Sequence, residues 1–220
     1  TQGNDKRIQE LTSMLNRMTH DNLNTMTIQI IDKIHDIENE NAEDMNRVYN
    51  VVVEMMLSNR FYIESYVKMC ITLKQEWSGL HNKIMEAIEN HKEALSALEM
   101  CDTTDYDRFC KLKALHDQQR TMTQFIVYMV IQKQLDPSIL DILYYQIDTL
   151  IQEGMKVPNK KNLLEEWVEH IYILLITGKP VFTVSKESIQ AMTKLSVKDY
   201  QSLTNKTVFR YMDIFETLFV

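Results

Sequence analysis

The sequence is poor in the two residues that most often mark turns, with only 4 Gly and 3 Pro among 220 residues. A fold of many short strands joined by tight turns needs more of both, because Gly adopts positive φ and Pro fixes φ for the turn. An all-β fold is therefore excluded. Long helices are the structure that we expect from such a chain.

The sequence also lacks long apolar runs and paired cysteines. Its apolar runs, such as 171–176, are far shorter than the roughly 20 residues of a membrane-spanning helix. Cys70, Cys101 and Cys110 are odd in number and contain no C-x-x-C pair, so neither a disulfide framework nor a zinc site is indicated. We expect a cytoplasmic protein without a membrane partner, a metal or a cofactor.

Residue patterns that carry enzyme chemistry are missing as well. The scattered glycines at positions 3, 79, 154 and 178 cannot build a phosphate-binding loop. Glu165, Glu166, Glu169 and His170 form one polar cluster, but they lack the E-x-x-H spacing of helical carboxylate metal sites. We interpret this cluster as a solvated helix face, and we predict no catalytic residues and a non-enzymatic protein.

The net charge of −7 argues against general nucleic-acid binding, which needs a surplus of cations. The charge is uneven, however: from Met155 to Val220 there are nine Lys or Arg against seven Asp or Glu, so this part carries +2. We predict that any RNA-binding surface lies there. Its candidate residues are Lys156, Lys160, Lys161, Lys179, Lys186 and Lys194.

Apolar residues recur with helical spacing along nearly the whole chain. Ile8, Leu11, Leu15 and Met18 follow steps of three and four and therefore share one helix stripe. The same pattern predicts helices over 8–18, 23–37, 45–57, 62–73, 80–98, 106–135, 139–154, 163–177, 185–195 and 205–219, the sixth with a break or bend. Five antiparallel pairs at a period of roughly 40 residues predict an all-α, HEAT-type solenoid over 1–220 as a single helical-repeat domain. A helical bundle is the alternative.

Several of these segments resemble the HEAT-repeat middle domain of eukaryotic translation initiation factor 4G. The first motif, Met14-Leu15-Asn16-Arg17-Met18-Thr19, is similar to the family's Ile-Leu-Asn-Lys-Leu-Thr. The second, Tyr62-x-x-x-Tyr66-x-x-Met69-Cys70, is similar to an aromatic-x-x-x-Tyr-x-x-Met-Cys motif. Weaker similarities follow at Phe125-Ile126, Leu135, Leu174-Leu175, Thr177-Gly178-Lys179 and Arg210-Tyr211-Met212.

The resemblance implies a translation initiation scaffold that binds a DEAD-box RNA helicase of the initiation factor 4A type. Helicase contacts would involve Leu15, Asn16 and Met18 at one end and Tyr211 at the other, with apolar side chains offered to the partner. mRNA is a second implied ligand, and a cap-binding protein is a third, reached through segments outside this domain. The setting would be the cytoplasm, and the host cytoplasm for a viral protein.

The sequence departs from the family in one region. Thr121-Met122 and Val127-Tyr128 stand where the family has Gly-Asn and Gly-Glu, so a contact surface there is altered. The alternative function is a related helical-repeat adaptor that binds other protein or RNA partners in mRNA metabolism without a helicase.

Overall fold

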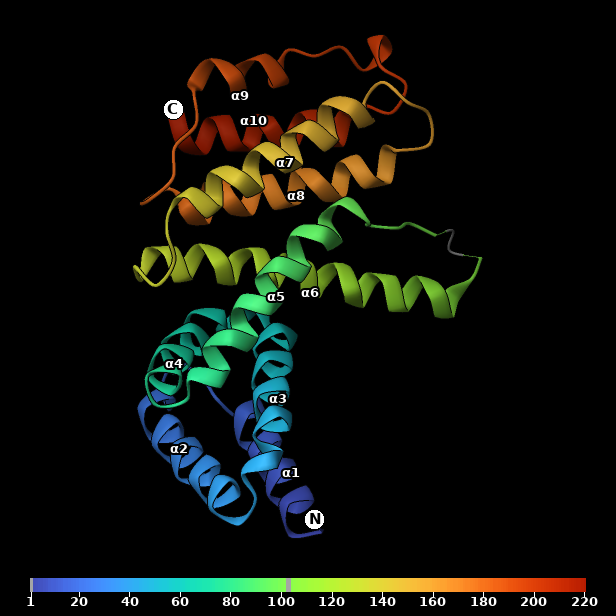
Figure 1. The fold of residues 1–220 in the computed structure, drawn as a ribbon. Helices are drawn as coiled ribbons and strands as arrows, with labels where there is room; N and C mark the ends of the chain where they lie inside the picture. The colour runs from blue at the N-terminus through green and yellow to red at the C-terminus, as the bar shows by residue number, and fades with distance from the viewer. Residues whose placement is uncertain (1, 102–103) are drawn as a thin grey trace. The chain divides into compact units, whose positions relative to one another are not determined.

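The computed structural model describes residues 2–101 and 104–220, and within these residues the chain is all-α, as predicted. Ten α-helices and three short 3₁₀ helices follow one another in the described part, with no strand among them (Figure 1). Within the same residues, no helix combines the length and the apolar composition that crossing a membrane requires.

The helices lie where the apolar periodicity predicts them. Their bounds are α1 Gln2–Asn16, α2 Leu23–Glu40, α3 Met45–Ser58, α4 Ile63–Glu76, α5 Ser78–Ser96, α6 Tyr106–Ile131, α7 Ser138–Gly154, α8 Lys161–Gly178, α9 Lys186–Thr193 and α10 Asn205–Phe219. The 3₁₀ helices are η1 Ala42–Asp44, η2 Arg60–Tyr62 and η3 Val197–Asp199.

Polar caps and one proline set several of these boundaries. The side chains of Asp105, Ser185 and Thr204 each accept a hydrogen bond from a backbone N–H in the first turn of α6, α9 and α10. Pro137 stands directly before α7, where its missing N–H costs nothing. The sixth helix, predicted over 106–135 with a break or bend, runs unbroken over 26 residues and ends at Ile131.

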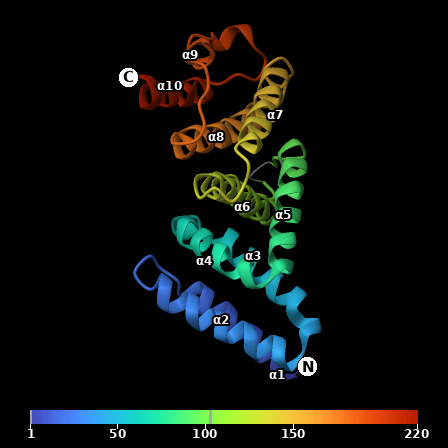
Figure 2. The same cartoon turned by 60° about the vertical axis from the view of Figure 1, so that its left-hand side comes forward.

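The chain divides into two compact units, an N-terminal unit up to Glu89 and a C-terminal unit from Asn90 onward, and the division falls within α5. In the N-terminal unit α1 pairs with α2 and α3 with α4, while α1 also packs on α3 and α2 on α4 (Figure 2). Contact between equivalent helices of successive pairs is typical of helical repeats. The core of this unit includes Leu11, Ile30, Val52 and Leu73, all fully buried.

In the C-terminal unit α7 pairs with α8 and α9 with α10, and α8 lies between α6 and α10 (Figures 1 and 2). Helix α8 therefore contacts three other helices, and its apolar residues are buried almost all round. Phe125, Leu143, Leu164 and Ile171 are fully buried in this core. A solenoid formed by all five pairs together stays a prediction.

Candidate functional site

The two segments that carry the strongest resemblance meet at one corner of the N-terminal unit. The hydroxyl of Tyr66 on α4 donates a hydrogen bond to the carbonyl oxygen of Leu15 on α1, at 2.9 Å. Nearby, Nδ1 of His20 lies 2.6 Å from the hydroxyl of Ser65, and the His20 ring packs edge-on against Tyr62 at 5.5 Å between centroids. The end of α1 is thus fixed to the start of α4.

The apolar residues expected to contact a helicase at this corner are buried. Leu15 is 0% exposed and Met18 is 1% exposed, so the prediction that they are offered to a partner is wrong. The physical reason lies in the periodicity: both residues belong to the single apolar stripe of α1, and this stripe faces α2 and α3. Asn16, by contrast, is exposed.

The two segments that meet here also carry exposed side chains, which together we call the Phe61 corner. They are Asn16, Arg17, His20, Arg60 and Phe61. Phe61 lies in η2 and is 91% exposed, which is the highest exposure of any internal large hydrophobic residue among the described residues. The corner therefore combines cationic and amide groups with one aromatic ring in water.

The expected contact residue in the C-terminal unit is also buried. Tyr211 on α10 is 1% exposed, so the prediction that it faces a partner is wrong. Burial raises the pKa of its phenol well above the ordinary value, and the nearby Asp148 and Tyr144 raise it further. Its hydroxyl has no hydrogen-bond partner within the described part of the chain.

Neighbouring residues of Tyr211 face outward instead. Phe209 is 59% exposed and Met212 is 37% exposed, and Asp213 and Glu216 lie exposed on the same side of α10. We call these four residues the α10 outer face. α10 packs on α8 and α9 through its other sides, so this face is apolar and acidic.

The six candidate RNA-binding lysines do not form one patch. Lys156, Lys160 and Lys161 lie at the turn between α7 and α8, whereas Lys179 and Lys186 lie beyond the opposite end of α8. These two groups are about 25 Å apart, because α8 has 18 residues and rises about 1.5 Å per residue.

Two of the distant lysines have structural contacts. Nζ of Lys179 donates to the carbonyl oxygen of Thr217 near the end of α10, at 3.2 Å. Nζ of Lys186 lies 5.4 Å from the ring centroid of Phe215 and 5.9 Å from that of Phe219. Lys194 follows the end of α9 and is exposed. RNA binding by any of the six stays a prediction, and the three at the α7–α8 turn are the larger of the two groups.

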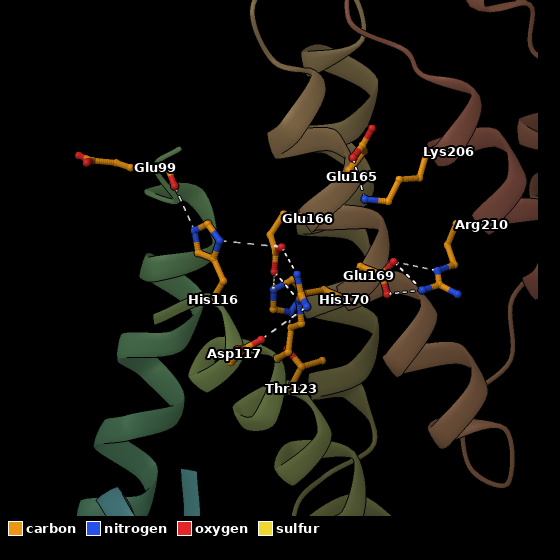
Figure 3. Close-up of polar contacts among 11 residues, drawn as sticks. Glu99, His116, Asp117, Thr123, Glu165, Glu166, Glu169, His170, Lys206 and Arg210 are labelled. Atoms are coloured by element: carbon orange, nitrogen blue, oxygen red, sulfur yellow. Dashed lines mark hydrogen bonds and ion pairs between the residues drawn. The ribbon is translucent and has the colours of Figure 1, made fainter. Parts of the chain in front are cut away.

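A row of carboxylates on α8 connects this helix to both neighbours (Figure 3). Glu165 pairs with Lys206 at 2.8 Å, and Glu169 accepts three hydrogen bonds from the guanidinium of Arg210 at 2.6, 2.7 and 2.9 Å, so both of these face α10. Glu166 faces the other way and accepts from both Nε and Nη2 of Arg120 on α6. Arg210 also lies 4.3 Å above the ring of Tyr172.

The interpretation of this cluster as a solvated helix face is wrong. Glu166 is 5% exposed and His170 is fully buried. The sequence shows four polar residues in one short stretch of α8, but α6 and α10 cover the two sides of that stretch. No group of side chains suited to a metal ion occurs among the described residues, this cluster included.

A chain of polar groups continues from Glu166 into the core. His170 lies 3.7 Å from Glu166, and its Nδ1 is 2.7 Å from the hydroxyl of Thr123. That hydroxyl is 3.0 Å from Nε2 of His91, whose Nδ1 donates to the side-chain oxygen of Gln119 at 2.5 Å. Burial lowers the pKa of His91 to about 4, and the hydrogen bond to Gln119 only partly opposes this shift. His91 is therefore neutral at pH 7.

The α8 carboxylates border a groove of about 480 Å³ in the C-terminal unit, which we call the charged groove. One side is formed by the first half of α6, and the other by α8 and α10. Its lining residues are Met100, Cys101, Phe109, Leu112, Lys113, His116, Asp117, Arg120, Asn162, Glu165, Glu166, Glu169, Lys206 and Arg210. Cations and carboxylates are equal in number in this lining, and most of them pair with one another.

Sequence reasoning missed Phe61, Phe209, His116 and Arg120. Phe61 could have been noticed because it lies in the short connection between Asn59, which follows the end of one helix, and the motif that begins at Tyr62. His116 and Arg120 carried no signal, since their importance comes from α8, which begins 41 residues after Arg120.

No protein-family model matches this chain, and neither the curated proteins nor the solved structures contain a significant match to it.

Proposed function

We propose that this chain is a non-enzymatic helical scaffold in translation initiation that binds a DEAD-box RNA helicase of the initiation factor 4A type. One observation supports this proposal beyond the resemblance itself. The two motifs that resemble the family most are about 45 residues apart in sequence, and they are hydrogen-bonded to each other at the Phe61 corner. A shared binding surface would require this kind of convergence.

The chemistry of the Phe61 corner suits a protein partner. Single exposed apolar residues are common on protein surfaces and need no explanation by themselves. Phe61, however, stands beside the exposed Arg60 in the sequence, and aromatic and arginine side chains are enriched in the residues that dominate binding energy. We therefore assign the main contact to Phe61, in place of Leu15 and Met18.

The α10 outer face is the second proposed contact. Phe209 and Met212 flank the buried Tyr211, so they take over the role that the resemblance implies for this segment. Their apolar side chains are accompanied by Asp213 and Glu216, which favour a basic partner surface.

The proposal is tested by adding the chain to an initiation factor 4A helicase and measuring RNA-stimulated ATPase activity and direct binding. We expect stimulation by the wild type. Phe61→Ala should weaken binding about 30-fold, because central anchors contribute about 2 kcal/mol or more. The matched control is Ile28→Ala, which removes another exposed apolar side chain of the same unit, 62% exposed, outside the corner.

Two results would contradict the proposal. The first is a wild-type chain that neither binds the helicase nor changes its ATPase activity. The second is equal binding by Phe61→Ala and Ile28→Ala, which would show that the corner is not the contact even if a helicase binds elsewhere.

A second candidate is a related helical-repeat adaptor that binds other protein or RNA partners in mRNA metabolism without a helicase. It is favoured by the burial of Leu15, Met18 and Tyr211, because three of the four side chains that the resemblance implies as helicase contacts lie in the interior. A pull-down with the wild-type chain separates the two candidates. Recovery of mRNA-processing proteins through Phe61, with no DEAD-box helicase among them, would favour the adaptor.

A further inference from the structure

Helix α7 is apolar on more than the side that it buries. Its inner side packs against α8, and Leu143, Ile147 and Ile151 are fully buried there (Figures 1 and 2). On the outer side, however, Ile142 is 52% exposed and Tyr145 is 66% exposed, and their spacing of three makes them neighbours on the helix surface. Helix α7 thus keeps apolar surface that no described part of the chain covers.

Two carboxylates share this outer side. Asp141 lies one turn before Tyr145 and Asp148 lies one turn after it, so the three residues follow steps of four and three and form one stripe. Asp141 is exposed and Asp148 is half-buried. We call these three residues, together with Ile142, the α7 outer face.

Neither carboxylate of the α7 outer face has a cation. No ion pair joins Asp141 or Asp148 to a lysine, arginine or histidine in the part of the chain that the structure describes. The side-chain amide of Gln152 contacts Asp148 at 3.5 Å, and burial still raises the pKa of this carboxyl above its ordinary value. The ionisable groups beside Asp148 are the phenols of Tyr144 and Tyr211, whose raised pKa values keep them uncharged at pH 7.

Elsewhere in the chain, a carboxylate and a tyrosine on one helix face bind an arginine. Glu169 and Tyr172 are neighbours on α8 at a spacing of three. The guanidinium of Arg210 lies 4.3 Å from the centroid of the Tyr172 ring and donates to both carboxylate oxygens of Glu169. Arg210 comes from α10, which packs against α8. An arginine from an adjacent helix therefore satisfies both side chains at once.

The α7 outer face has the same combination of side chains without the arginine. Asp141 stands four residues before Tyr145, and Asp148 adds a second carboxylate on the other side of the ring. The rings of Tyr144 and Tyr145 meet edge-on, with 5.6 Å between their centroids, and this contact restricts the Tyr145 ring in advance. A guanidinium suits this face because it is planar, stacks on aromatic rings and pairs with carboxylates.

Charge selects against two other occupants of the α7 outer face. The phosphates of a nucleic acid would be repelled by the two carboxylates. A second copy of the chain that used the same face would bring four carboxylates together, and like charges placed opposite each other disfavour association. A basic protein segment meets neither obstacle.

We propose that the α7 outer face binds a basic segment of a partner protein, with an arginine guanidinium stacked on Tyr145 between Asp141 and Asp148. An apolar side chain of the same segment would pack on Ile142. The face shares no residue with the Phe61 corner or the α10 outer face, so the inference does not depend on helicase binding.

The test is an NMR titration of the whole chain with a short, acetylated and amidated peptide that carries two arginines and a leucine. One control peptide has citrulline in place of arginine, which keeps the planar group and removes the charge. A second has lysine, which keeps the charge and removes the planar group. We expect the arginine peptide to bind about tenfold more tightly than the citrulline peptide, and several-fold more tightly than the lysine peptide.

The carboxyl resonance of Asp148 gives a separate readout in the same titration. In the free chain its pKa is raised by burial, and a bound guanidinium should lower this pKa because a nearby cation stabilises the carboxylate. The citrulline peptide should leave the pKa where it is. Higher salt should weaken the arginine peptide's binding, since the contact is partly exposed.

Variants of Tyr145 separate stacking from apolar contact. Tyr145→Phe keeps the ring and should bind the arginine peptide as the wild type does. Tyr145→Leu keeps an apolar side chain without a ring and should weaken binding about fivefold. The matched control is Tyr106→Leu, because Tyr106 is 71% exposed on α6 and has no carboxylate three or four positions after it. This control should bind normally.

Four outcomes would overturn the inference. The wild type could fail to bind the arginine peptide, or it could bind the arginine and citrulline peptides equally. Tyr145→Phe and Tyr145→Leu could bind equally, which would show that the ring is not used. Sedimentation of the chain alone could show a dimer that Tyr145→Leu dissociates, which would make a second copy the occupant of this face.

Discussion

Tyr66 and Tyr211 are each only 1% exposed, but their hydroxyl groups differ in hydrogen bonding. The hydroxyl of Tyr66 donates to the carbonyl oxygen of Leu15, while that of Tyr211 has no partner in the described residues. A buried polar group without a partner loses its hydration and gains nothing in return.

The two Tyr→Phe substitutions should therefore change stability in opposite directions. We expect Tyr66→Phe to lower the free energy of unfolding by about 1 kcal/mol, because it removes a buried hydrogen bond to the Leu15 carbonyl, which then keeps only the backbone N–H of Met18 as a donor. Tyr211→Phe should be neutral or raise the free energy by about 1 kcal/mol. Urea unfolding of both variants measures this, and equal losses in both would show that Tyr211 has a partner.

His91 makes the stability of the C-terminal unit depend on pH. Its pKa in the folded state is about 4, below the 6.5 of an unfolded histidine, because burial disfavours the charged ring. A lowered pKa means that the stabilising contribution is complete above pH 6.5 and is lost as the pH falls toward 4.

We expect this titration to account for a loss of up to about 3 kcal/mol between pH 6.5 and 4. His91→Gln cannot titrate and should lose correspondingly less stability over the same pH range. His81→Gln, at an exposed histidine, should behave like the wild type. The measurement is urea unfolding at a series of pH values, and identical pH profiles for His91→Gln and the wild type would contradict the assignment.

At the scale of the helix, α8 determines how α6 and α10 lie against it. Its carboxylates pair with α10 on one side and with α6 on the other, but the two sides differ in burial. Glu169 is 21% exposed in its side chain and Glu166 only 5%. A carboxylate in water loses little when its cation is removed, whereas a buried one is left uncompensated.

Arg120→Met should therefore lower the free energy of unfolding by about 3 kcal/mol or more. Arg210→Met, the matched change on the other side, should cost about 1 kcal/mol. Adding Glu166→Gln to Arg120→Met should recover part of the loss, because it removes the uncompensated charge. The contrast is checked by urea unfolding, and similar losses from the two single variants would argue against a special role for burial.

The turn between α7 and α8 carries the largest group of candidate lysines, Lys156, Lys160 and Lys161, none of which forms a hydrogen bond or ion pair with α10 among the described residues. Replacing Lys156, Lys160 and Lys161 with Ala should lower the slope of log K against log salt by about 2, the value for three lost contacts to a single strand. Lys179→Ala with Lys186→Ala should leave the slope unchanged, because these lysines contact α10. Fluorescence anisotropy with labelled RNA over a salt series decides this, and a slope that is unchanged by the triple variant would exclude the α7–α8 turn.

At the scale of the whole molecule, the chain has two compact units with a core in each. The sequence contains two tryptophans, and the division places one in each unit: Trp77 is 5% exposed in the N-terminal unit and Trp167 is 4% exposed in the C-terminal unit. Each tryptophan can therefore report the unfolding of its own unit after the other is replaced by Phe.

We expect two separable unfolding transitions. In the presence of Arg120→Met, the midpoint that Trp167 reports should fall, while the midpoint that Trp77 reports should stay the same, because the substitution lies in the C-terminal unit alone. Fluorescence-detected urea titrations of the two Trp→Phe backgrounds provide the measurement. Midpoints that fall together would instead support the single domain that the sequence predicts over 1–220.

The helices and their buried stripes followed from the sequence because helical spacing is a local property. Leu11 and Leu15 are three or four positions from other apolar residues, and this alone predicts that they share a face. The same reasoning should have predicted that Leu15 and Met18 are buried. Residues of a buried stripe are not available to a partner, so the helicase contact that the resemblance implies for them conflicts with the periodicity.

The exposed and charged surfaces depended on contacts between distant segments. Phe61 is exposed although it lies between two buried helices, and Glu166 is buried because α6 lies over one side of α8. A sequence window around Glu166 contains only α8, so the local pattern predicts that the polar residues of this helix are solvated. Its partner Arg120 is 46 residues away.

By itself, the sequence determined that this chain is all-α, where its helices lie and which residues form their inner stripes, because backbone geometry fixes which neighbours share a helix face. Only the tertiary structure decided which polar side chains are enclosed, which aromatic rings remain in water and how the groove is lined. Those properties depend on which helices pack together, and packing joins side chains that no local pattern relates.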